Sequence, residues 1–112
     1  GAFVERVREA AALPRPRPAL AARALQRLLP RLAPVFGVPP AALRSGSRLR
    51  AVTQARAAVS AVAVLVLGLP ATQVAAVLGV PQMAVLRGVA RGRSLLEAQR
   101  IDPERLGREA LM

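Results

Sequence analysis

Between Ala10 and Leu96 the sequence contains no Asp or Glu, while twelve arginines alternate there with Ala, Leu and Val at helical spacing. Ala and Leu are strong helix formers, and apolar residues three and four positions apart form one face of a helix. The whole chain has two Phe and neither Tyr nor Trp. We therefore expect an all-α fold with a core of small aliphatic side chains.

The acidic and basic residues are distributed unevenly along the chain. The formal net charge is +11, all seventeen basic residues are Arg, and the six acids lie only in the two end segments. A GC-rich genome would explain Arg in place of Lys, but it would not explain the missing acids. Because guanidinium groups bind phosphates and guanine edges, the imbalance indicates a polyanionic partner.

Several function classes are excluded by what the sequence lacks. Without Cys or His there are no disulfides, no ordinary zinc sites and no His-based catalysis. The apolar run 57–80 is interrupted by Gly68-Leu69-Pro70, which argues against a membrane span. We expect a cytoplasmic, nucleoid-associated protein that is not an enzyme, with no metal, cofactor, small-molecule substrate or membrane partner.

The length of 112 residues suits one compact domain with arms. We expect an N-terminal helix and a Pro/Arg-rich linker over residues 1–18, a main domain over 19–96 and a helical tail over 97–112. Because the chain begins with Gly, we expect it to be one part of a longer polypeptide.

The apolar spacing predicts a bundle of five to seven helices. The main ones are expected over 19–36, in a short turn through Leu43, over 48–67, up to Leu78 and over 81–91. Pro30 and Pro34 should kink or split the first of these. Gly92 should interrupt the last, with a further helix capped near Ser94 and another starting at Asp102.

The strongest local signal spans residues 73–85. Two helices that cross sharply need a small residue where they touch and a turn residue that accepts a positive φ, here Ala75 and Gly79. Apolar residues must pin the second helix to the first, and Val74, Leu78, Val80 and Val85 occupy those places. The pattern predicts a helix-turn-helix; the alternative is an ordinary helical corner in the core.

In a helix-turn-helix the second helix reads the major groove of DNA with its N-terminal side chains. If Val85, Gly88 and Val89 face inward, the opposite side presents the candidate contacts Gln82, Met83, Ala84, Arg87 and Arg91. Gln suits adenine, Arg suits guanine, and Met83 and Ala84 suit thymine methyl groups. Arg91 is better placed for phosphates.

A second cluster precedes the central helix and opens it. Its candidate phosphate ligands are Arg44, Ser47, Arg48, Arg50, Thr53 and Arg56. Basic and hydroxyl side chains beside the free N–H groups of a helix N-terminus suit phosphate binding. The alternative is a solvated loop whose arginines only keep an apolar domain soluble.

The order of these segments resembles the C-terminal DNA-binding domain of the bacterial replication initiator DnaA. The resemblance covers roughly residues 25–96 and rests on Phe36-Gly37-Val38, the stretch 47–56, the apolar helix and the helix-turn-helix. It implies a Trp-repressor-like fold in which the basic loop, here Arg48, Arg50 and Arg56, contacts phosphates and the minor groove. The chain also resembles activators of gene transfer agent production, which carry a DnaA-like module.

The departures from that family limit what carries over. Its recognition helix begins with Asp-His-Thr-Thr, where this chain has Gln82-Met83-Ala84-Val85, and its acidic central-helix end is replaced here by residues 64–67, Val-Leu-Val-Leu. No P-loop is present. The resemblance thus implies the fold and docking mode of the family but not its target sequence.

The function expected from these signals is sequence-specific binding of double-stranded DNA by a transcription activator, with RNA polymerase or another transcription component as a further partner. Two alternatives stay open. One is a replication initiator or mobile-element protein that uses the same module. The other is a helical protein-interaction module of the transcription machinery. Leu95, Leu96 and Ile101 are expected to cap the core or, alternatively, to form a dimer contact.

Overall fold

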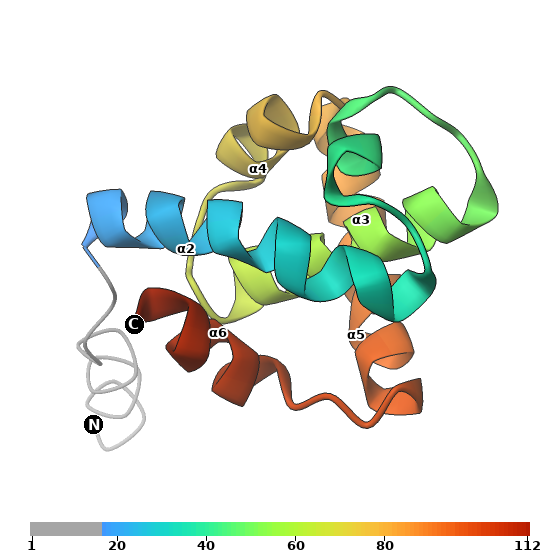
Figure 1. The fold of residues 1–112 in the computed structure, drawn as a ribbon. Coiled ribbons are helices and arrows are strands. Elements are labelled where there is room, and N and C mark those ends of the chain that lie inside the picture. The colour runs from blue at the N-terminus through green and yellow to red at the C-terminus, as the bar shows by residue number, and fades with distance from the viewer. Residues whose placement is uncertain (1–16) are drawn as a thin grey trace, which may run out of the picture.

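The computed structural model describes residues 17–112, and this part of the chain is all-helical. Five α-helices and two short 3-10 helices follow one another (Figure 1): α2 (Pro18–Leu32), η1 (Ala33–Phe36), η2 (Pro40–Arg44), α3 (Arg50–Leu65), α4 (Ala71–Leu78), α5 (Gln82–Ala98) and α6 (Pro103–Leu111). The all-α expectation is confirmed. The predicted helix at 2–12 and most of the predicted linker lie outside the described residues.

Helix α3 is the centre of the molecule. It packs against α2, α4, α5 and α6, and most of its residues from Ala57 to Ala63 are fully buried. A helix that is apolar on all sides is stable only when neighbours cover every side. The prediction of a central helix in this segment is therefore confirmed.

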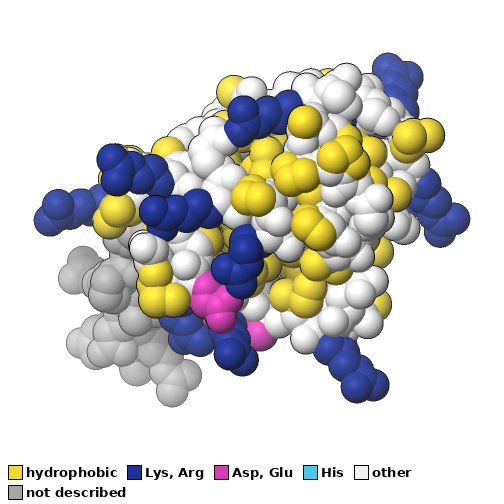
Figure 2. Space-filling model, viewed as in Figure 1, with side chains coloured by type: hydrophobic (Ala, Val, Ile, Leu, Met, Phe, Trp, Pro, Cys, Tyr) yellow, Lys and Arg dark blue, Asp and Glu magenta, His cyan; other side chains and the backbone are white. Residues whose placement is uncertain are grey.

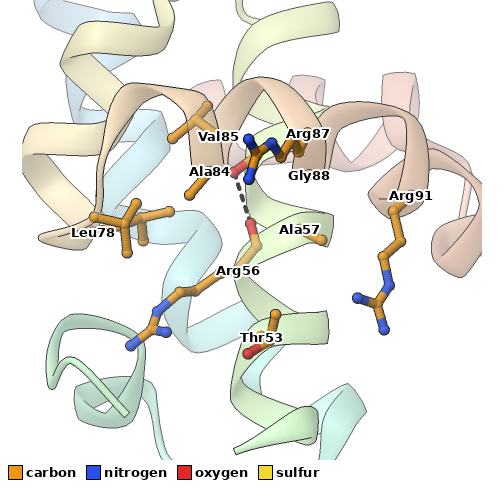
Figure 3. Close-up of a pocket in the computed structure, with 11 residues that line it drawn as sticks. Thr53, Arg56, Ala57, Leu78, Ala84, Val85, Arg87, Gly88 and Arg91 are labelled. Carbon is orange, nitrogen blue, oxygen red and sulfur yellow. Dashed lines mark hydrogen bonds between the residues drawn. The ribbon is translucent and has the colours of Figure 1, made fainter. Parts of the chain in front are cut away.

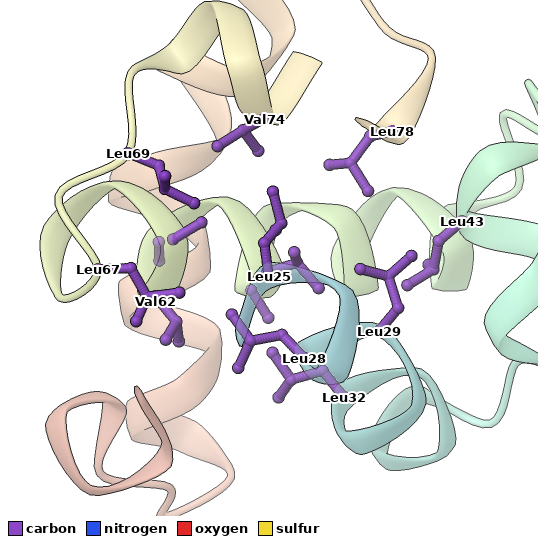
Figure 4. Close-up of a cluster of buried hydrophobic side chains, with 14 of the residues drawn as sticks. Leu25, Leu28, Leu29, Leu32, Leu43, Val62, Leu67, Leu69, Val74 and Leu78 are labelled. Atoms are coloured by element: carbon purple, nitrogen blue, oxygen red, sulfur yellow. The ribbon is translucent and has the colours of Figure 1, made fainter. Parts of the chain in front are cut away.

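Leucines of α2 fill the space beneath α3 (Figure 4). Leu25, Leu28 and Leu32 are completely buried, and Leu43 of η2 and Leu78 of α4 join the same cluster. Each such leucine contributes roughly 1.5–3 kcal/mol when its side chain leaves water. The three-and-four spacing in α2 thus has the structural role that the sequence predicts.

One predicted break occurs and another does not. The segment expected as a helix over 19–36 is split as predicted: α2 passes through Pro30 and ends at Leu32, and the chain continues as the 3-10 helix η1, which contains Pro34. Helix α5 runs unbroken from Gln82 to Ala98, so the predicted interruption at Gly92 and the separate helix near Ser94 are wrong. Gly92 is buried against α3, and that contact keeps it inside the helix.

Helix α6 completes the core from the C-terminal side. Asp102 caps its start by accepting a hydrogen bond from the Glu104 backbone N–H at 3.0 Å, as the predicted helix start requires. Leu106 and Ala110 are buried against α2 and α3, and Leu96 at the end of α5 is fully buried as expected. The expected boundary at 96/97 falls within α5.

Candidate functional site

Helices α4 and α5 form a sharply bent pair. They are joined by residues 79–81 and cross at 100°. Gly79 has a φ of 66°, which a glycine adopts without strain. Of the four predicted pinning residues, Val74, Leu78 and Val85 are buried and Val80 is half-buried. Within residues 17–112 no single helix has the length and apolar character to cross a bilayer; only this bent pair together reaches it.

The start of α5 lies on the surface. Gln82, Met83, Ala84, Arg87 and Arg91 are all exposed, and Val85 is 1% exposed on the opposite side. At 3.6 residues per turn, Met83 is directed away from the buried side, whereas Ala84 and Arg91 are directed toward the start of α3, and Arg87 lies at the edge of the cavity between the two helices. The cavity that Ala84 and Arg91 share with Thr53 of α3 agrees with this placement.

The loop before α3 lies beside the α4–α5 turn. A Cβ atom added to Gly79 would lie 3.8 Å from the carbonyl oxygen of Arg44. Arg48 and Arg50 are exposed, and Arg50 sits one turn before Thr53 on the side of α3 that faces α5. The two sequence-predicted clusters are thus neighbours in space, although residues 57–81 separate them in the chain.

Arg56 has a structural role that the sequence does not reveal. Its guanidinium donates to the carbonyl oxygens of Leu43 at 2.9 Å, Ser47 at 2.5 Å and Ala42 at 3.4 Å. Partial burial lowers the pKa of Arg56 from its ordinary value. Among the predicted phosphate ligands, Arg56 is therefore the one that fixes the loop to α3.

Short hydrogen-bonded turns hold the rest of the loop. The Leu49 backbone N–H donates to Ser47 Oγ at 3.3 Å, and Thr53 Oγ1 donates to the Leu49 carbonyl oxygen at 3.1 Å. Arg44 donates to the side-chain oxygen of Gln26 on α2. The loop therefore presents Arg48 from a fixed backbone, and Arg50 follows as the first residue of α3.

Glycine permits an unusually close approach of α5 to α3. A Cβ atom added to Gly92 would lie 1.9 Å from the Ala57 carbonyl oxygen, and one added to Gly88 would lie 3.3 Å from the Ala57 Cα. This contact is not among the sequence-based predictions, although two glycines four residues apart, facing small residues on another helix, are a usable signal for close helix packing.

Arginines also occupy a second region, where α2 meets α6. Arg27 donates to the Ala110 carbonyl oxygen at 3.1 Å, and Arg31 forms an ion pair with Glu109 at 2.6 Å. On the face seen in Figure 2, the few acidic side chains gather together with arginines beside them. Residues 17–96 contain no acid at all, so the α5 surface has no such neighbours on its own helix before Glu97.

The described residues contain no group of three or more His, Cys, Asp or Glu side chains that could hold a metal ion. Comparison with protein-family models, curated proteins and solved structures gives no match.

Proposed function

We propose that this protein binds double-stranded DNA in a sequence-specific manner, as the DNA-binding part of a bacterial transcription regulator. The observation that carries the proposal is the pairing of an exposed, arginine-bearing α5 start with the arginine loop before α3. The Arg44 end of this loop lies beside Gly79 in the α4–α5 turn, and Thr53 and Arg56 of α3 share a cavity with Arg87 and Arg91. Residues 17–96 of this domain contain no acid.

The geometry of α4 and α5 supports this function. Helices at about 90–120° joined by a short turn containing glycine are typical of helix-turn-helix DNA-binding motifs. The observed angle is 100°, with Gly79 in the turn. A major groove about 12 Å wide admits one helix, and the exposed first turns of α5 are the part that would enter it.

The residues divide by chemistry into two roles. We assign Arg87 and Gln82 to base edges, since Arg pairs with guanine and Gln with adenine in two-bonded arrangements. We assign Arg48, Arg50 and Arg91 to phosphates, with Arg44 and Thr53 beside them. A protein with this function works at the nucleoid and contacts RNA polymerase or another transcription component.

Selection of bound sequences from random duplexes tests the proposal directly. We expect an enriched motif, and we expect log K to fall with log salt at a slope of about 4 to 5 if roughly five arginines contact phosphate. A salt-independent response, or no enrichment, would contradict DNA binding.

A charge reversal identifies the surface. Arg48→Glu together with Arg50→Glu should abolish binding while the fold stays intact. Arg105→Glu, in α6 and remote from this surface in the sequence, should leave DNA binding unchanged and serves as the control. Persistent DNA binding in the double variant would instead favour a protein-interaction module. Genomic footprints at promoters support a regulator, and footprints at origins or element ends support an initiator or mobile-element protein.

A further inference from the structure

A cavity of about 280 Å³ opens between α3 and α5 (Figure 3). Its size lies just below the roughly 300–1,000 Å³ typical of small-molecule sites. Small apolar groups form its floor and cationic or hydroxyl groups form its rim, among them Ala57, Ala84, Gly88, Thr53, Arg87 and Arg91.

The cavity follows from how the two helices approach. The backbones touch at Gly92, where an added Cβ would lie 1.9 Å from the Ala57 carbonyl oxygen, and the fit is looser at Gly88, where an added Cβ would lie 3.3 Å from the Ala57 Cα. Farther toward the start of α5 the side chain is Ala84, which is exposed and too short to fill the widening gap. The space is therefore built into the crossing of the helices.

The polar groups around the cavity are mostly already used. The hydroxyl of Ser60, which is 2% exposed, donates to the Arg56 carbonyl oxygen at 2.8 Å, and the Thr53 hydroxyl donates to Leu49. The guanidinium of Arg56 donates to three carbonyl oxygens of residues 42–47.

Arg87 and Arg91 are different from these groups. Neither guanidinium has a hydrogen-bond or ion-pair partner among residues 17–112, and no Asp or Glu lines the cavity. The two lie four residues apart on α5, where like charges repel. An anion placed between them would relieve that repulsion.

We propose that this cavity binds a small organic carboxylate with a short aliphatic chain. Its carboxylate accepts hydrogen bonds from Arg87 and Arg91, and its chain lies on the floor formed by Ala57, Ala84 and Gly88. The regulatory consequence rests on the proposed function: because the ligand occupies two arginines of the DNA-binding surface, it competes with DNA.

Direct titration of the full chain, followed by amide NMR shifts, tests the site without DNA. The probes are hexanoate, acetate and hexan-1-ol. Each buried methylene adds about fourfold in affinity, so hexanoate should bind at least about tenfold more tightly than acetate. It should also bind more tightly than the uncharged alcohol. Equal affinities of acetate and hexanoate would overturn the proposal, because the arginines would then attract any carboxylate and the aliphatic chain would not occupy the cavity.

Two matched pairs of variants locate the site. Ala84→Leu fills the cavity and should abolish hexanoate binding, whereas Ala90→Leu places the same side chain on an exposed part of α5 outside the cavity. Arg91→Gln should weaken binding by about tenfold, and Arg93→Gln should leave it unchanged, since Arg93 does not line the cavity. Retained binding in Ala84→Leu would contradict this location.

The effect on DNA is measured separately, at constant ionic strength. Hexanoate should weaken the affinity of the wild-type chain for its selected duplex, and acetate at the same concentration should not. If hexanoate binds but DNA binding fails, the cavity proposal stands and the proposed function fails. If DNA binds and hexanoate does not, the cavity proposal alone is wrong.

Discussion

The two arginine regions of this protein use one side chain for different purposes. At the α2–α6 contact, Arg27 donates to a helix carbonyl and Arg31 pairs with a carboxylate, so both guanidinium groups have partners within the molecule. At the α5 surface, Arg87 and Arg91 have no partner among the described residues. The partners of the arginines, rather than their number, therefore distinguish a structural surface from a candidate binding surface.

The largest effect should come from the contact that holds the α5 arginines in place. Gly92→Ala would put a Cβ 1.9 Å from the Ala57 carbonyl oxygen, which forces α5 away from α3. We expect a loss of about 3 kcal/mol in the free energy of unfolding, at the upper end for overpacking, measured by urea denaturation. Gly88→Ala, with a 3.3 Å approach, should be nearly neutral. Equal stabilities of the two variants would show that the contact of Gly92 with Ala57 does not hold α5 against α3.

Removing one unpaired arginine tests the binding surface itself. Arg87→Gln should weaken binding to the selected duplex by about 1–3 kcal/mol and relax the preference at one base pair. Arg31→Gln, at the paired region, should leave DNA affinity unchanged and alter stability by less than about 1 kcal/mol. Equal losses of affinity in both variants would remove the distinction between the two regions.

Arg56 belongs to the candidate surface by position but resembles the paired region by its contacts. Arg56→Met keeps the aliphatic stem and loses the hydrogen bonds to residues 42–47. We expect a loss of about 1–2 kcal/mol in stability, reduced because the group is partly exposed, with faster amide exchange in that loop. Arg50→Met should change neither quantity. Unchanged stability with weakened DNA binding would make Arg56 a ligand contact instead.

The smallest effect concerns pH and the paired region alone. A hydrogen bond from Arg31, aided by Arg105, lowers the pKa of Glu109. Because the folded state favours the ionised carboxylate, its contribution is full above the ordinary Glu pKa of about 4.3 and is lost as pH falls through the lowered value. Glu109→Gln should lower Tm slightly at about pH 6 and match the wild type at about pH 2. Glu104→Gln, whose side chain has no such partner among the described residues, is the control.

Much of the fold could be predicted because its signals are local. The leucine spacing of α2, the positive φ at Gly79 and the Asp102 cap each depend on a few neighbouring residues. The error at Gly92 has the opposite origin. Glycine lowers helix propensity, and only the Ala57 backbone on another helix explains why α5 continues through it.

The sequence predicts which residues belong to the candidate site, but not how they are arranged in space. Charge and spacing selected the arginines of the loop and of α5. The sequence could not indicate that Arg56 binds backbone carbonyls up to 14 residues away. Nor could it indicate that Ala84 lines a cavity, because the gap depends on the angle and distance between two helices.

The glycine contact at Ala57 also has a consequence for how this sequence can change. With no room between the backbones, α5 cannot turn about its own axis, so the outward positions keep their direction whatever residues occupy them. Substitutions of Met83 and Arg87 would then change the side chains presented at the surface while α5 keeps its position. New target preferences could arise by substitution there without any rebuilding of the scaffold.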